Sequence, residues 1–163
     1  MDIKNKLKLY LDSYLKPIEE EKGFLKRARL GAVCECCEAS SINNYINENK
    51  DEDTFQTKLF KLIDERELKD SDVYNKVNID RRLFSKIRSN KDYHPSKETI
   101  ILFGLALELE EREIVDLLES ASYSLPMNST FDLIIRFCFK EHIYNIDTVN
   151  GFLYDYKCKL LGE

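Results

Sequence analysis

At 163 residues, with 43% hydrophobic and 34% charged side chains, the chain is long enough for one folded domain and too apolar to be disordered throughout. Its five glycines and three prolines are few, and with abundant Leu, Ile, Lys and Glu they favour a mostly helical protein. No apolar run approaches the length of a membrane span and no signal peptide opens the chain, so we expect a cytoplasmic protein with no membrane partner.

The first fifty residues contain one clear element. Apolar side chains recur at helical spacing between residues 2 and 16, which predicts an amphipathic helix that ends near Pro17. Residues 38–53 are rich in polar side chains, and we interpret them as a linker. We therefore divide the chain into an N-terminal amphipathic helix with a linker, residues 1–50, and a helical domain, residues 51–163. The sequence leaves open whether the first segment packs against the second.

The second segment shows apolar spacing typical of helices along most of its length. In chain order it predicts helices over residues 54–67, 71–77, 81–89, 96–107, 111–121, 129–141 and 147–159. Asp53, Asp80 and Ser96 are the expected N-caps of the first, third and fourth. The helix over 129–141 is apolar almost all round, which predicts burial on several sides. The fold class is therefore all-α.

Charge is distributed unevenly along the chain. The formal net charge is −5, yet residues 80–97 carry six basic and two acidic residues, a local charge of +4. Residues 101–163 carry eleven acidic and five basic residues. A basic patch on an acidic body can orient a protein on DNA, and it can equally meet an acidic protein partner.

The segment between Leu59 and Leu118 combines a short helix, a turn, a basic helix, a loop with a proline and a long apolar helix. Its pattern residues are Val73, Ile79, Ile87, the loop segment 91–100 and the apolar run 101–109. With these residues the segment resembles the Cro/C1-type helix-turn-helix family, also called lambda-repressor-like or XRE. The resemblance implies a five-helix domain whose second and third helices form the motif.

A narrower resemblance concerns residues 78–93. They are similar to a helix-turn-helix-like segment of uncharacterised bacterial proteins, some of which carry it behind other domains, macro domains among them. Together the two resemblances cover about residues 51–163. They imply an all-α, lambda-repressor-like helix-turn-helix bundle with extra N-terminal and C-terminal helices.

The resemblance also implies a site on the basic helix. Once Leu83, Phe84 and Ile87 turn inward, its polar side chains would face the major groove of DNA, where Arg pairs with guanine edges and Ser or Lys reach bases or phosphates. With the loop that follows, the implied DNA-binding residues are Arg81, Arg82, Ser85, Lys86, Ser89, Lys91 and His94. His94 has a simpler interpretation as a surface turn residue. Asn78 and Asn90 are expected to adopt a positive φ at the two ends of this helix.

Two residues depart from the family's pattern. Asp70 stands where the family usually has Gln beside a DNA phosphate, and a carboxylate there weakens binding. Tyr74 stands where the family keeps a small Ala between the two helices, so it requires a different helix crossing or an outward orientation. Two hypotheses follow. The first is a transcriptional regulator that binds double-stranded DNA, with a homodimer expected. The second is a helical protein–protein interaction module that kept the fold without DNA binding.

Other chemistry finds little support in the sequence. It has no glycine-rich phosphate loop, no nucleophile elbow and no His-Glu-x-x-His, so we expect a protein that is not an enzyme and has no cofactor. Cys34, Cys36 and Cys37 form a cluster without a second ligand pair nearby, which favours free thiols over a metal site or a disulfide. Aromatic residues are dense over 123–156, where they can close the core, pair two copies or dock a partner.

Overall fold

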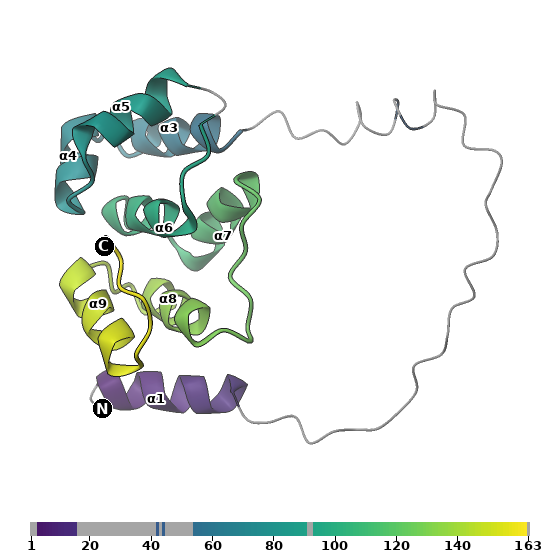
Figure 1. Ribbon diagram of the computed structural model, residues 1–163, viewed down its shortest axis with the longest axis vertical. Coiled ribbons are helices and arrows are strands. Elements are labelled where there is room, and N and C mark those ends of the chain that lie inside the picture. The colour runs from purple at the N-terminus through teal and green to yellow at the C-terminus, as the bar shows by residue number, and fades with distance from the viewer. Residues whose placement is uncertain (1–2, 16–41, 43, 45–53, 91–92, 163) are drawn as a thin grey trace. The chain divides into compact units, whose positions relative to one another are not determined.

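The computed structural model describes residues 3–15, 42, 44, 54–90 and 93–162 (Figure 1). Over these residues it contains eight α-helices and no strand, which confirms the all-α fold class. They are α1 (Ile3–Tyr14), α3 (Phe55–Glu65), α4 (Asp70–Lys76), α5 (Arg81–Ser89), α6 (Lys97–Ala106), α7 (Glu111–Ser120), α8 (Thr130–Lys140) and α9 (Ile146–Asp155). None of these described helices is long and apolar enough to cross a membrane. The predicted linker lies almost entirely outside the described residues.

Side-chain caps define where most of the helices begin. Asp80 and Ser96 cap α5 and α6, as predicted: their side chains accept hydrogen bonds from the backbone N–H groups of Arg82 and Thr99. The prediction of Asp53 as the cap of α3 is wrong. Thr54 takes that place, because its hydroxyl oxygen lies 3.3 Å from the backbone N of Thr57.

Six helices end in the same way at their C-terminus. The residue after each C-cap has a positive φ without being glycine, and these residues are Glu67, Asn78, Glu108, Ser122, His142 and Lys157. The next residue is apolar or aromatic, and its backbone N–H donates to a carbonyl oxygen five residues earlier, as Ile79 does to Tyr74 at 2.9 Å. This Schellman arrangement stops a helix at once. It explains why α3 and α9 end at Glu65 and Asp155, short of the predicted 67 and 159.

Asn90 does not share this conformation. Its φ of −118° and ψ of 106° are extended, so the prediction of a positive φ after α5 is wrong, whereas Asn78 has the predicted positive φ of 53°. The backbone N–H of Asn90 donates to the Lys86 carbonyl at 3.0 Å, and the N–H of Tyr93 donates to the Asn90 carbonyl at 3.1 Å, so α5 ends without a left-handed residue at Asn90.

Two helices, α6 and α8, supply the centre of the core. Every residue of α6 from Ile100 to Ala106 is buried, and α8 buries nearly all of its residues from Asp132 to Phe139. The predicted burial of the region 129–141 on several sides is thus confirmed. In Figure 1, α6 and α7 lie between the group α3–α5 and the pair α8 and α9. Helices α4 and α5 therefore pack against a part of the core, around α6, that is enclosed by other helices.

The N-terminal helix belongs to this same compact unit, which consists of residues 1–16 and 53–163. Helix α1 packs against α8 (Figure 1), with Leu7 and Leu11 buried. The ring of Tyr10 lies 5.4 Å from that of Phe137, and the ammonium of Lys4 lies 2.8 Å from the Asp155 carboxylate. The question that the sequence left open is therefore answered for α1, which folds onto the helical domain.

Partly buried ion pairs connect the elements around α8. Asp132 is only 4% exposed, and its carboxylate lies 2.6 Å from the Lys97 ammonium at the start of α6. Arg136 donates to the Leu125 carbonyl at 3.0 Å and pairs with Glu111 at 2.8 Å. Because a buried charge without its partner is costly, these pairs fix the loop between α7 and α8 and the start of α6.

Gly104 provides a test of the packing around α6. A Cβ atom at this position would lie 2.5 Å from Cδ1 of Ile114 and 2.9 Å from Cζ of Phe139, so α7 and α8 approach the glycine backbone closely. Ala favours a helix over Gly by about 1 kcal/mol, but the overpacking is larger. We expect Gly104→Ala to lower the free energy of unfolding by about 1–3 kcal/mol in urea denaturation.

Gly151 in α9 is the matched control. A Cβ there meets no atom within 4 Å, so only the helix preference changes. Gly151→Ala should raise the free energy of unfolding by about 0.5–1 kcal/mol. Equal effects of the two substitutions would show that α6 is less tightly enclosed than its contacts imply.

Candidate nucleic-acid interface

Helix α5 has two different faces. Phe84 and Ile87 are buried, and the ring of Phe84 lies 5.8 Å from that of Phe103 in α6. The opposite face holds five of the predicted DNA-binding residues, all exposed: Arg81, Arg82, Ser85, Lys86 and Ser89. The apolar side thus fixes the helix to the core, while the polar side is presented to solvent as a row of basic and hydroxyl groups.

A short connection sets the position of α5 relative to α4. It runs from Val77 to Asp80, and both Val77 and Ile79 are buried. Asn78 between them takes the positive φ that allows a tight turn, because its short polar side chain tolerates this conformation. The turn is therefore anchored on both sides of Asn78, which holds the two helices in one relative orientation.

The cations of α5 differ in what they contact. Over the part of the chain that the structure describes, the side chains of Arg81 and Arg82 make no ion pair. The Lys86 ammonium lies 4.5 Å from the centre of the Tyr93 ring. Arg88 pairs with Asp70 and stacks on Phe60, with 4.7 Å between its guanidinium and the ring centre. Arg81, Arg82 and Lys86 are therefore the cations of this face whose side chains make no ion pair within the described residues, although the Asp80 carboxylate caps the same helix at the backbone N–H of Arg82.

Other basic and loop residues of the predicted patch are arranged differently. Lys97 pairs with buried Asp132, so it adds no unpaired charge to the exposed face of α5. His94 is exposed, and its Nδ1 lies 3.4 Å from the Tyr123 hydroxyl, which connects the loop to the region after α7. Lys91 lies outside the described residues.

The two residues that depart from the family's pattern are both accommodated. The Asp70 carboxylate pairs with Arg88, so its charge is partly neutralised within the protein. Tyr74 is half-buried rather than fully outward, and its ring lies 5.7 Å from that of Phe84 at an angle of 55°. An aromatic contact thus occupies the place between α4 and α5 where the family has a small side chain.

A groove of about 580 Å³ lies between the start of α4 and α5. It is lined by Leu68, Lys69, Asp70, Ser71, Tyr74, Arg81, Phe84, Ser85 and Arg88. Only Arg81 and Ser85 of these were expected at a site. Sequence reasoning missed the rest because Leu68 and Arg88 look like ordinary surface residues until the turn at Asn78 brings the two helices together.

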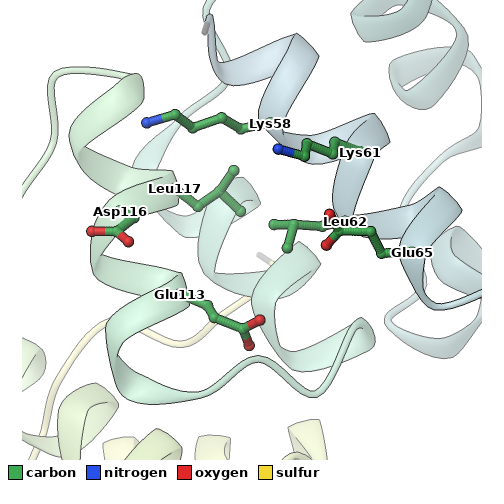
Figure 2. A pocket seen from close by; sticks show the side chains of 7 residues that line it. All are labelled: Lys58, Lys61, Leu62, Glu65, Glu113, Asp116 and Leu117. Carbon is green, nitrogen blue, oxygen red and sulfur yellow. The ribbon is translucent and has the colours of Figure 1, made fainter. Parts of the chain in front are cut away.

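A second hollow, of about 200 Å³, lies between α3 and α7 (Figure 2). Lys58 and Lys61 extend from α3, while Glu113 and Asp116 come from α7, with Leu62 and Leu117 between them. Both signs of charge are present, so this hollow presents no single potential to a polyanion such as DNA. This hollow is therefore a poorer candidate for a nucleic-acid interface than the exposed face of α5.

The cysteines that the structure describes are not arranged as a metal site. Burial raises the pKa of the Cys138 thiol to about 12, so it stays protonated as a small apolar core residue. Cys158 is half-buried, and burial also raises its pKa. Within the described ranges no group of three or more His, Cys, Asp or Glu could hold a metal ion. Cys34, Cys36 and Cys37 lie outside these ranges.

No family model matches this chain, and neither a curated protein sequence nor a solved structure matches it. The resemblance to the Cro/C1-type family therefore stays a prediction from the residues of α4, α5 and the loop that follows. What the chain does has to be inferred from its own geometry and charge.

Glu113, at the edge of the hollow in Figure 2, gives a pH test of this region. Burial raises its pKa, but the backbone N–H of Glu110 and the guanidinium of Arg66 lower it more, so the net pKa lies below the ordinary 4.5. The carboxylate therefore contributes stability above that value and loses it as pH falls through the folded-state pKa. We expect the difference in the free energy of unfolding between wild type and Glu113→Gln to shrink as the pH falls from the ordinary pKa to the folded-state pKa, as measured by urea denaturation at several pH values.

Arg66→Gln serves as the comparison. It removes the guanidinium, which lies 2.8 Å from the Glu113 carboxylate, and it keeps the capping hydrogen bond to Glu110. The free energy of unfolding of Arg66→Gln should therefore lose only part of its dependence on pH. If both variants followed the wild-type profile, the Glu113 carboxylate would have no such role in the folded protein.

Proposed function

We propose that this protein binds double-stranded DNA through the exposed face of α5 and acts as a transcriptional regulator rather than as an enzyme. The observation that carries the proposal is this face itself. Within the described residues the side chains of Arg81, Arg82 and Lys86 on this face make no ion pair, and the hydroxyls of Ser85 and Ser89 lie on the same face. Such a row of donors can pair with phosphates and with base edges in the major groove.

The arrangement of α4 and α5 supports a helix-turn-helix in the lambda-repressor-like sense. A seven-residue helix, a turn at Asn78 and a nine-residue basic helix follow one another, and both helices rest on α6 or its neighbours. A recognition helix has to be held rigidly, because its side chains read bases only at a fixed distance. Phe84 and Ile87 supply this anchoring through their burial.

The charge of the chain is compatible with this proposal, although its sum is −5. Association with DNA depends on the local potential of the contacting face more than on the total. The Asp70 carboxylate, which would repel a phosphate, is paired with Arg88. What DNA would meet along α5 is therefore a mainly cationic surface.

We further propose that the regulator works as a homodimer, because proteins of this kind read two-fold DNA sites with two copies. Most of the aromatic residues between 123 and 156 lie in or against the core, among them Phe137, Phe139 and Phe152. Tyr154 on α9 differs, since 74% of its surface is exposed. The outer face of α9 is accordingly our candidate for the pairing surface.

The first test compares two double variants on random-sequence duplex DNA at two salt concentrations. Arg82→Ala/Lys86→Ala removes one Arg and one Lys from α5, whereas Lys8→Ala/Arg112→Ala removes the same two charges from exposed positions in α1 and α7. We expect the α5 variant to bind more weakly by about 1–3 kcal/mol and to reduce the salt slope by about 1 for each lost phosphate contact. The control should behave like wild type.

Two results would contradict the proposal. One is the absence of DNA binding by the wild type even at low salt, and the other is equal weakening in both double variants. The first result would leave the protein–protein interaction module as the alternative function for this fold.

Asp70→Asn gives a test in the opposite direction. It removes a carboxylate from the edge of the α5 face and releases Arg88, so DNA affinity should rise on the order of threefold to tenfold at low salt, or about 1 kcal/mol. Asp116→Asn on α7 changes the charge equally and should have little effect. Because both side chains of the Asp70–Arg88 pair are partly exposed, the stability of Asp70→Asn should stay within about 1 kcal/mol of wild type. A decrease in DNA affinity would indicate that DNA does not approach this face.

A further inference from the structure

The groove between α4 and α5 combines two features, and duplex DNA needs only the second of them. One is an apolar wall: Leu68 is 37% exposed, Tyr74 is half-buried, and both line the groove together with Phe84. The phosphates and sugars of DNA offer no apolar side chain to this wall. An exposed leucine beside aromatic rings is instead the kind of surface that receives an apolar anchor residue from another protein.

The second feature is the charge around that wall. Lys69, Arg81 and Arg88 line the groove, and Asp70 is the one acidic residue among its lining residues. Asp70 is already paired with Arg88. The groove therefore has an excess of two positive charges, in a protein whose total charge is negative. Such a groove attracts a carboxylate-rich ligand and selects against basic ones.

The two features belong to one groove, so a single peptide segment can contact both. A single groove of about 580 Å³ contains both, with Ser71 and Ser85 as hydroxyl groups along its sides. A guanidinium binds a carboxylate through two parallel hydrogen bonds, and Arg81 makes no ion pair that would compete within the described structure. An apolar side chain on the wall would hold the peptide in register with these cations.

We propose that the α4–α5 groove binds an acidic segment of a partner protein, with one apolar side chain against Leu68, Tyr74 and Phe84 and flanking carboxylates on Arg81 and Arg88. This inference goes beyond DNA binding and does not depend on it. The groove shares Arg81 and Ser85 with the proposed DNA face, whereas Arg82, Lys86 and Ser89 are not among its lining residues. The two sites can therefore be separated by mutation.

The experiment uses the full chain and a fluorescent peptide in which one leucine is flanked on both sides by glutamates. Binding is measured by fluorescence anisotropy for wild type, Leu68→Ser and Arg81→Glu. Arg81 is exposed and Leu68 is 37% exposed, and because Leu68 also follows the left-handed Glu67 that ends α3, circular dichroism is used to check that each variant keeps its helix content. Each variant should bind the peptide about tenfold more weakly or worse, as expected for loss of an anchor contact or a charge partner.

Leu9→Ser in α1 and Arg112→Glu in α7 are the matched controls, because they make the same exchanges at exposed positions away from the groove. They should keep the wild-type affinity. The Arg82→Ala/Lys86→Ala variant should also bind the peptide like wild type, even if it loses DNA. Failure of DNA binding and failure of peptide binding would thus be seen separately.

Four outcomes would overturn the proposal. The peptide fails to bind wild type, or it binds the groove variants and the control variants equally. In the third, a peptide with serine in place of leucine binds as tightly as the leucine peptide, which would show that the groove contributes only its charge to binding. A single-stranded oligonucleotide that displaces the peptide and binds more tightly would assign the groove to nucleic acid instead.

Discussion

Close packing around α6 is the constraint on which the other helices depend. This helix is buried from Ile100 to Ala106, and Gly104 lets Ile114 of α7 and Phe139 of α8 approach its backbone. Because protein interiors pack as densely as crystals, a fixed α6 fixes the helices around it. The contact of Phe103 in α6 with Phe84 in α5 fixes the position of α5 in the same way. The rigidity that a recognition surface requires therefore originates far from the surface itself.

The ends of the helices contribute a second kind of order. Six of them stop in a left-handed residue that is not glycine, followed by an apolar or aromatic residue whose backbone N–H returns to the helix. A positive φ costs a residue such as Glu67 or Lys157 some energy, and the recovered hydrogen bond and apolar contact offset it. The result is a set of short connections. At Asn78 the same device brings α4 and α5 together and creates the groove between them.

Charge is separated in space as well as in sequence. Acidic residues pair with cations over much of the body, as in Arg66 with Glu113 and Lys97 with Asp132. On α5, Arg81 and Arg82 have no such partner in the described structure. A protein of net charge −5 can thus present a basic face, and whether a polyanion or an acidic protein meets it depends on shape as much as on charge. The exposed face of α5 is our candidate site for a polyanion, and the groove with Leu68 is our candidate site for an acidic protein segment.

The sequence by itself determined the all-α class, the approximate position of each described helix, the caps at Asp80 and Ser96 and the exposure of the polar residues of α5. These features depend on periodicity and on local hydrogen bonds, which neighbouring residues decide. Helix ends such as Glu65 and Asp155, the extended Asn90 and the cap at Thr54 were mispredicted, because several residue types are locally acceptable there. Only the tertiary structure decided that α1 packs on α8, that Asp70 pairs with Arg88 and that Leu68 faces the groove, because each joins residues distant in sequence through packing that periodicity does not record.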